Sequence, residues 1–195
     1  MEMRTMQIKA PKVREDNGKR YLEGYFAVFD EPYNVINGWV ETVARGAFAR
    51  YLSTGGDVKV LWNHDANLVL GSTGNGTATL IEDERGLWGS VEINPADTDA
   101  LNALARVERG DVTGCSFGFE IARQEEWWDD DGVYHTRITE VDPLYEVSPC
   151  TFPAYRATSI AARSRETLED AKKRRNALWK ENMLKRMKGE IRYGT

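Results

Sequence analysis

Apolar and polar positions alternate along much of the chain, and this two-residue spacing predicts strands. The alternating segments are rich in aromatic and β-branched residues and are bounded by Gly, Pro, Asn and Asp, which favour turns. Two of them flank the acidic stretch Glu82-Asp-Glu-Arg and predict a hairpin across it. The strands predicted before the midpoint are 21–29, 58–62, 68–70, 77–82 and 86–93.

Helical spacing interrupts this pattern within the body of the chain. Residues 46–52 predict a short helical turn that stops at a pair of glycines. A longer helix is predicted to begin at Asp97 or Thr98, either of which can cap it, and to end near Gly110. The predicted apolar face of this helix consists of Leu101, Leu104 and Ala105.

Strand alternation returns after the helix, in residues 116–121, 133–141 and 145–151. The acidic run Asp129-Asp-Asp-Gly between the first two lacks the ligand spacing and the closing glutamate of an EF-hand. We therefore interpret this run as a solvated hairpin tip and expect a β-rich body interrupted by one central helix.

The last segment has a different character. Residues 163–195 contain 11 basic and 5 acidic residues, whereas residues 1–162 contain 15 basic and 26 acidic residues, so the formal net charge of -5 combines an acidic body with a basic tail. We expect these two ranges to be separate parts of the protein. In the tail, Ser164 is predicted to cap a loosely amphipathic helix. The helix carries Leu168, Ala171, Leu178, Trp179, Met183 and Met187.

Composition excludes several classes of protein. Two cysteines without C-x-x-C spacing argue against a disulfide framework and against a structural zinc module. Zinc bound by Cys115, Cys150, His64 and His135 is kept as an alternative, but no metal and no cofactor is expected. No segment approaches the ~18 apolar residues of a membrane span, and the N-terminus lacks an apolar signal region. The acidic body argues against a broad nucleic-acid face and leaves the tail as the segment able to bind phosphates.

The two histidines are candidates for a general base. His64 follows an apolar strand where the chain runs into a loop, and such positions place side chains at clefts. His135 follows the acidic tip and alternates as an exposed strand residue. Asp65 would face away from His64 in extended backbone, so we interpret it as a turn residue. His64 is the better candidate, although a histidine in this setting is more commonly structural.

Ser116 is a candidate nucleophile because Gly114-Cys-Ser-Phe-Gly satisfies the pattern G-x-S-x-G. A nucleophile elbow, however, needs a strand-to-helix turn and the chain order Ser, acid, His. Here a strand pattern follows the serine, and His64 precedes it. A triad of Ser116, Asp130 and His135 would keep the order but would take its acid from a short hairpin tip. The sequence therefore argues against a nucleophile elbow.

Glu146 stands out in the apolar segment 144–150, because a carboxylate is costly to bury without a partner. It either pairs with an arginine or holds an imidazole in the tautomer that a catalytic triad requires. His64, Ser116 and Glu146 all belong to predicted strands, which can bring distant positions together.

A series of motifs in chain order resembles the prohead (procapsid maturation) serine proteases of tailed bacteriophages, distant relatives of the herpesvirus assemblins. Together the motifs cover about residues 20–162. They are Gly24-Tyr-Phe-Ala-Val-Phe-Asp, Glu41 to Gly46-Ala-Phe, Trp62-Asn-His-Asp, Leu70-Gly, Asp83-Glu-Arg-Gly-Leu-Trp, Arg109-Gly-Asp-Val-Thr-Gly-Cys-Ser-Phe-Gly-Phe, and Leu144-Tyr-Glu-Val-Ser-Pro-Cys-Thr-Phe-Pro-Ala-Tyr.

The resemblance implies an α+β fold with a mainly antiparallel, β-barrel-like core, a few helices and a C-terminal helical tail. It implies His64 as general base, Ser116 as nucleophile and Glu146 as third member, in place of the second histidine of assemblins. Glu140 and Asp142 compete for this third role. Cys115, where other small or apolar residues are expected, is an alternative nucleophile, but as the strand neighbour of Ser116 it is expected to face away. The resemblance suggests Arg156 for the oxyanion hole.

By the same resemblance, the protein is a serine endopeptidase that acts inside the assembling procapsid in the host cytoplasm. Its substrates are the scaffold or delta segment of the major capsid protein and the protease itself. Because assemblins are activated by homodimerisation, a homodimer is also implied. The rival hypothesis is a noncatalytic capsid assembly or scaffolding protein of the same fold. For the tail we consider targeting, scaffold-like and removable roles, and nucleic-acid binding as a further hypothesis.

Overall fold

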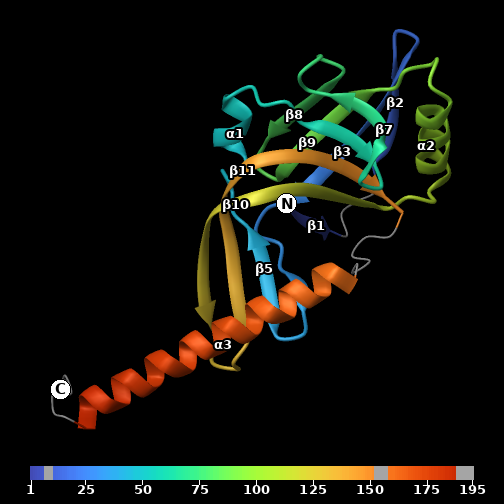
Figure 1. Ribbon diagram of the computed structural model, residues 1–195. Helices are drawn as coiled ribbons and strands as arrows, with labels where there is room; N and C mark the ends of the chain where they lie inside the picture. The colour runs from blue at the N-terminus through green and yellow to red at the C-terminus, as the bar shows by residue number, and fades with distance from the viewer. Residues whose placement is uncertain (7–10, 152–157, 188–195) are drawn as a thin grey trace.

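The computed structural model describes residues 1–6, 11–151 and 158–187, which form two β-sheets and three helices (Figure 1). In the larger sheet the strand order is β1-β10-β11-β5-β4, and β6 pairs with both β11 and β7. Its strands are β1 (Glu2–Met6), β4 (Tyr33–Ile36), β5 (Trp39–Val43), β6 (Lys59–Trp62), β7 (Asp65–Ser72), β10 (Gly114–Trp128) and β11 (Tyr134–Cys150).

The smaller sheet has the strand order β2-β3-β9-β8, and all its pairs are antiparallel. Its strands are β2 (Lys12–Asp16), β3 (Lys19–Val28), β8 (Ala78–Glu82) and β9 (Gly86–Glu92). The predicted hairpin across Glu82-Asp-Glu-Arg is therefore confirmed. Strands β1, β2, β4 and β5 were not predicted.

One main core joins the two sheets and the helix α2 (Thr98–Arg109). Phe117 is fully buried in this core. Its ring centroid lies 5.5 Å from that of Phe48, in edge contact, and 4.7 Å from that of Phe119. The α+β class is confirmed. The barrel-like core is not observed, because the described strands pair within two separate sheets and no ladder of backbone hydrogen bonds closes one sheet onto the other.

The long hairpin of β10 and β11 occupies the interior of the larger sheet, with the other strands arranged around it (Figure 1). Residues 133–141 and 145–151 were predicted as two strands, but they belong to the single strand β11 up to Cys150. This strand pairs in parallel with β5 through its first part and with β6 at Glu146 and Val147. Register shifts between Gly118 and Gln124 mark bulges in the hairpin. They lie between the part of the hairpin that pairs with β5 and the part that pairs with β6.

The predicted start and end of helix α2 are confirmed. Asp97 is the N-cap, and its carboxylate accepts hydrogen bonds from the backbone N–H groups of Asp99 at 2.9 Å and Ala100 at 3.2 Å. The helix ends at Gly110, whose φ of 85° lies in the left-handed region. Ala105 is exposed, so its predicted place on the buried face was wrong. The buried face keeps the helical period but is shifted by one residue toward the N-terminus from the predicted face. It consists of Ala100, Ala103, Leu104 and Val107. The predicted helical turn near residue 50 is α1 (Ala49–Ser53).

The C-terminal helix α3 (Thr158–Met187) begins before the expected boundary at residue 163. Ser164 is a buried residue within the helix, so its predicted role as N-cap was wrong. Leu168 and Ala171 are buried in a second apolar cluster. The other buried members of this cluster are Ile36, Trp39 and Tyr134. The first half of α3 therefore packs on the end of the larger sheet.

The second half of α3 projects away from the body (Figure 1). Its side chains Leu178, Trp179, Met183, Leu184 and Met187 are all exposed. In the part of the chain that the structure describes, no helix combines the length and apolar character needed to cross a bilayer.

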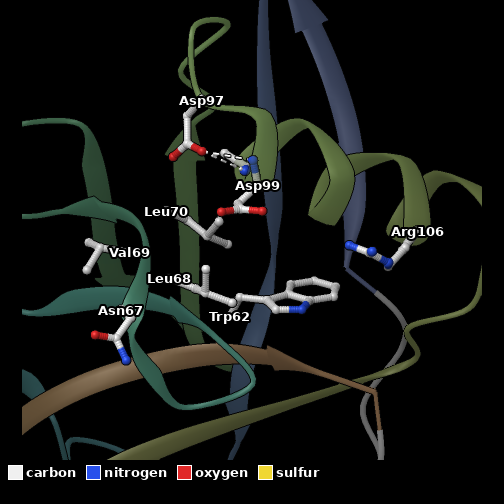
Figure 2. Close-up of a pocket in the computed structure, with 9 residues that line it drawn as sticks. Trp62, Asn67, Leu68, Val69, Leu70, Asp97, Asp99 and Arg106 are labelled. Atoms are coloured by element: carbon white, nitrogen blue, oxygen red, sulfur yellow. Dashed lines mark hydrogen bonds between the residues drawn. The ribbon is translucent and has the colours of Figure 1, made fainter.

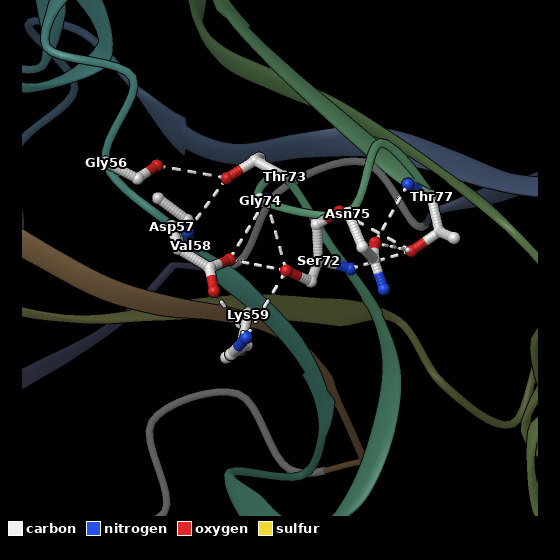
Figure 3. A network of polar contacts seen from close by, with 9 residues as sticks. All are labelled: Gly56, Asp57, Val58, Lys59, Ser72, Thr73, Gly74, Asn75 and Thr77. Atoms are coloured by element: carbon white, nitrogen blue, oxygen red, sulfur yellow. Dashed lines mark hydrogen bonds and ion pairs between the residues drawn. The ribbon is translucent and has the colours of Figure 1, made fainter.

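A network of polar contacts holds the segment before β6 against the turn after β7 (Figure 3). The Asp57 carboxylate accepts hydrogen bonds from Lys59 Nζ at 2.5 Å, from the hydroxyl of Ser72 and from the backbone N–H of Gly74 at 3.0 Å. These hydrogen bonds lower the pKa of Asp57 to about 2, and the bond from Lys59 has the largest effect.

This lowered pKa predicts a pH-dependent contribution to stability. The ordinary pKa of Asp57 is 3.8, so the charged form stabilises the fold above about pH 4, and this contribution is lost as the pH falls toward 2. Asp57→Asn is expected to lower the free energy of unfolding at neutral pH, and its difference from the wild type should shrink as the pH falls through about 2. Urea unfolding at several pH values measures this. The same substitution at exposed Asp131 is the control, and equal pH profiles for the two variants would contradict the prediction.

Candidate active site

Strands β10 and β11 present serine and glutamate side chains on one face of the larger sheet. Ser116 lies directly opposite Ser148, and Gly118 lies directly opposite Glu146. Residues opposite one another in an antiparallel pair share a face, and so do residues two apart along a strand. Ser116 and Glu146 therefore project from the same side of the sheet, close to each other.

Gly118 gives the carboxylate of Glu146 its space. A Cβ atom at position 118 would lie 2.5 Å from Oε1 of Glu146, much closer than van der Waals contact allows. The second glycine of the G-x-S-x-G match thus makes room for a side chain from the neighbouring strand, and no strand-to-helix elbow follows Ser116.

His64 comes from the two-residue turn between β6 and β7. Trp62 pairs with Asp65, and the two residues between them, Asn63 and His64, have φ angles of 53° and 63°. Such angles are typical of a tight hairpin turn and cost a histidine roughly 1 kcal/mol. The strand end predicted at His64 is confirmed, whereas Asp65 is the first residue of β7 and not part of the turn itself.

This turn is fixed to the end of β11. The backbone N–H of Asn63 donates to the carbonyl of Pro149 at 3.1 Å. The Asn63 amide donates to the hydroxyl of Thr151 at 3.1 Å and accepts from the Thr151 backbone N–H at 2.8 Å. These bonds hold the turn, and with it His64, against the strand that carries Glu146.

The structure brings His64 and Glu146 into direct contact. Nδ1 of His64 lies 2.7 Å from Oε1 of Glu146. The Glu146 side chain is 5% exposed and the His64 side chain 21% exposed, so the pair is shielded yet open at the ring. Because a carboxylate accepts hydrogen bonds, it favours the tautomer with the proton on Nδ1 and leaves Nε2 free to take a proton.

The competing acids are engaged elsewhere. Glu140 pairs with Arg50 and, at 3.2 Å, with Arg123. Asp142 lies 3.4 Å from the Arg50 guanidinium. Both carboxylates are thus paired with arginines, whereas Glu146 contacts His64, so geometry favours Glu146 among the three predicted acids.

The hydroxyl of Ser116 is fully buried and donates to the carbonyl of Arg4 on β1, at 2.9 Å. Nε2 of His64 contacts Sγ of Cys150 at 3.6 Å. Burial, together with the negative charge of Glu146, raises the pKa of Cys150 to about 12. At neutral pH this thiol is therefore protonated and is a poor nucleophile.

The other candidate groups lie apart from this face. Cys115 is packed in the main core, and burial raises the pKa of its thiol. His135 contacts Asp129 at 2.8 Å and pairs with Trp127, eleven residues along β10 from Ser116. At about 3.3 Å per residue this separation is on the order of 35 Å along the strand. The alternative triad is therefore not assembled.

The described residues contain no group of three or more His, Cys, Asp or Glu side chains able to hold a metal ion. The four residues of the zinc alternative are accordingly not gathered in one place. Arg156, suggested for the oxyanion hole, lies outside the described residues.

Sequence reasoning did not find a buried charge cluster that involves β1, the strand paired with β10. Arg4 on β1 pairs with Glu41 on β5, and Glu41 also accepts hydrogen bonds from Tyr33 and, at 2.9 Å, from Thr136. Burial opposes the charge on Arg4, but the attraction of Glu41 raises its pKa. Burial and the charge of Glu41 also raise the pKa of Tyr33. The cluster anchors β1, whose carbonyl at Arg4 accepts the Ser116 hydroxyl.

A pocket of about 350 Å³ lies between the β6–β7 hairpin and α2 (Figure 2). Its walls combine apolar side chains of the hairpin with charged side chains near α2. They include Trp62, Leu68, Leu70, Asp97, Asp99 and Arg106. Since Trp62 is two residues from His64, the pocket adjoins the hairpin that carries the candidate base.

A histidine held by a carboxylate, with a serine on the same sheet face, has the chemical elements of a serine hydrolase site. The family model described as caudovirus prohead serine protease matches residues 5–174, so the chain belongs to this family. It is 32% identical over 155 residues to the prohead protease of Enterobacteria phage HK97. This similarity covers 77% of the chain and 63% of the relative, so the chain spans less than two thirds of that protein's length. No solved structure matches the chain.

Proposed function

We propose that this protein is a serine endopeptidase of phage head maturation, with Ser116 as nucleophile, His64 as general base and Glu146 as the group that orients the imidazole. The observation that supports this most directly is the 2.7 Å contact of His64 Nδ1 with Glu146, on the sheet face that also carries Ser116. Family membership supplies the reaction class.

In the proposed reaction, Nε2 of His64 takes the Ser116 proton as the serine oxygen attacks the scissile carbonyl. Collapse of the tetrahedral intermediate breaks the peptide bond, the leaving amine takes the proton from His64, and an acyl-enzyme remains. Water activated by the same histidine then hydrolyses the ester. Glu146 stabilises the imidazolium that forms at each step.

The Ser116 hydroxyl has to change partner before it can react. In the structure it is buried and donates to the Arg4 carbonyl. Attack requires rotation about its Cα–Cβ bond toward His64 and admission of a peptide to the face. We therefore propose that the described arrangement is a resting one and that substrate binding reorients the serine.

The relative from HK97 is named a prohead protease, and the proposed substrates follow from that name and from the family. They are the scaffold or delta segment of the major capsid protein and the protease itself, cut inside the procapsid in the host cytoplasm. We also propose a homodimer and a functional division at residues 162 and 163. Residues 163–195 would be the segment that directs targeting or is removed, and its exposed basic part lies beyond the buried residues Leu168 and Ala171.

The deciding experiment is coexpression of the wild type or Ser116→Ala with the capsid protein, followed by intact-mass analysis. Loss of a triad member is expected to reduce turnover by roughly 10⁴-fold or more, so Ser116→Ala leaves the capsid protein and the tail uncut. Ser90→Ala, on β9 of the other sheet, is the matched control and should process normally. Unchanged processing by Ser116→Ala would favour the rival, a noncatalytic assembly protein.

A further inference from the structure

The hydroxyl of Ser148 links the two sides of the candidate His64–Glu146 pair. It donates to Oε2 of Glu146 at 2.6 Å and accepts the backbone N–H of His64 at 3.2 Å. Ser148 is fully buried, so water does not compete for these bonds. One side chain thus contacts both the carboxylate and the backbone of the residue that the carboxylate orients.

The direction of these bonds has a chemical consequence. A hydroxyl has one proton to donate, and here Oε2 of Glu146 accepts it, so the carboxylate is held by this oxygen while Oε1 faces His64 Nδ1. With Oε2 occupied by the Ser148 proton, Oε1 is left to accept the proton on Nδ1 of His64.

The backbone bond has a different role. Asn63 already holds the turn to Pro149 and Thr151, which lie beyond the carboxylate along β11. The bond from the His64 N–H to Ser148 fixes the next residue of the turn, two positions from Glu146 along the strand. The Ser148 hydroxyl therefore positions both the backbone that carries the imidazole ring and the carboxylate.

We infer that Ser148 is a positioning residue, which sets the register of His64 against Glu146 and selects the oxygen that Glu146 presents to the ring. This inference rests on the proposed function. Ser148 contacts no reacting atom in this assignment and acts through the two residues it binds.

The kinetic test compares Ser148→Ala with the wild type on a peptide that contains a capsid cleavage site. Loss of a hydrogen bond to a charged group is expected to lower kcat about 10- to 100-fold and to leave KM unchanged. Ser148→Thr, which keeps the hydroxyl, should recover most of kcat. Ser148→Cys keeps the side-chain shape with a weaker donor and gives the same test if Ser148→Ala does not fold.

Thr136→Val is the matched control. Thr136 lies on the same strand, is buried, and also donates to a buried carboxylate, that of Glu41 at 2.9 Å. Its loss is expected to lower thermal stability but not kcat. If both variants lower kcat equally, or if Ser148→Ala and Ser148→Cys keep the wild-type kcat, the inference is wrong.

A second readout does not depend on catalysis. The chain has two histidines, so a His135→Gln background leaves His64 as the source of any imidazole N–H signal. A downfield proton resonance from Nδ1–H is expected in this background and should weaken or vanish on adding Ser148→Ala, but not on adding Thr136→Val. Persistence of the resonance in Ser148→Ala would overturn the inference. If the resonance is lost in the Ser148→Ala variant but the wild-type protein cleaves no capsid protein, the result would count against the proposed function alone.

Discussion

Glu146→Gln is expected to lower kcat by about 10⁴-fold while the protein remains folded. The amide has nearly the shape of the carboxylate, but it presents N–H donors as well as an oxygen and carries no charge. It therefore no longer selects the tautomer with the proton on Nδ1 of His64, and it no longer stabilises the imidazolium. In the Ser-His-Asp proteases, the equivalent loss of the carboxylate has an effect of this size. Steady-state cleavage of a capsid-site peptide measures it.

The controls are Glu140→Gln and Asp142→Asn, the other acids considered for the third role. Both carboxylates pair with Arg50 in the structure, and we expect these variants to keep kcat within a few-fold of the wild type. A large kcat loss in either control, with little loss in Glu146→Gln, would reassign the third member of the triad. Circular dichroism of all three variants checks that the fold is intact.

Arg4→Met is expected to produce the largest loss of stability, about 3–5 kcal/mol in the free energy of unfolding. Its partner Glu41 is fully buried, so removal of the guanidinium leaves a carboxylate in the core without a counter-charge. The hydrogen bonds from Tyr33 and Thr136 remain, but they are neutral donors. Urea unfolding monitored by tryptophan fluorescence measures the change.

Arg14→Met is the matched control. Like Arg4, Arg14 pairs with a glutamate, here Glu23. Arg4 lies over the ring of Phe119 at 5.7 Å and Arg14 over that of Tyr21 at 4.3 Å, but Arg14 is on the surface of the smaller sheet. A much smaller loss is expected there, because water screens exposed ion pairs. Adding Glu41→Met to Arg4→Met should recover most of the lost stability, since no unpaired charge is then buried. Equal losses in the two single arginine variants would show that Arg4 contributes through packing and not through charge.

Local patterns were enough to predict elements whose stability is decided nearby. The hairpin of β8 and β9 has turn residues between two alternating runs, and α2 has a side-chain cap and a terminal glycine. Strand β1, by contrast, is short and charged, and it depends on pairing with β10, more than a hundred residues later. The start of α3 also could not be located from Ser164, because that helix is set by packing against the sheet.

For the candidate site, the sequence identified the residue types but not their partners. His64, Ser116 and Glu146 were selected through ordered motifs, whereas their contacts depend on the strand register of β10 and β11 and on the docking of a two-residue turn. The role of Gly118 and the contacts of Ser148 follow from the same register. Periodicity alone does not specify register between strands far apart in the chain.

The contacts of the proposed site join segments that are synthesised far apart in time. The Ser116 hydroxyl contacts a carbonyl 112 positions earlier, and His64 contacts a carboxylate 82 positions later. A nascent chain that has left the ribosome only as far as β9 contains His64 but neither Ser116 nor Glu146. Such long-range contacts form late and slowly. The contacts that assemble the proposed site can therefore form only after β10 and β11 have been made and have paired.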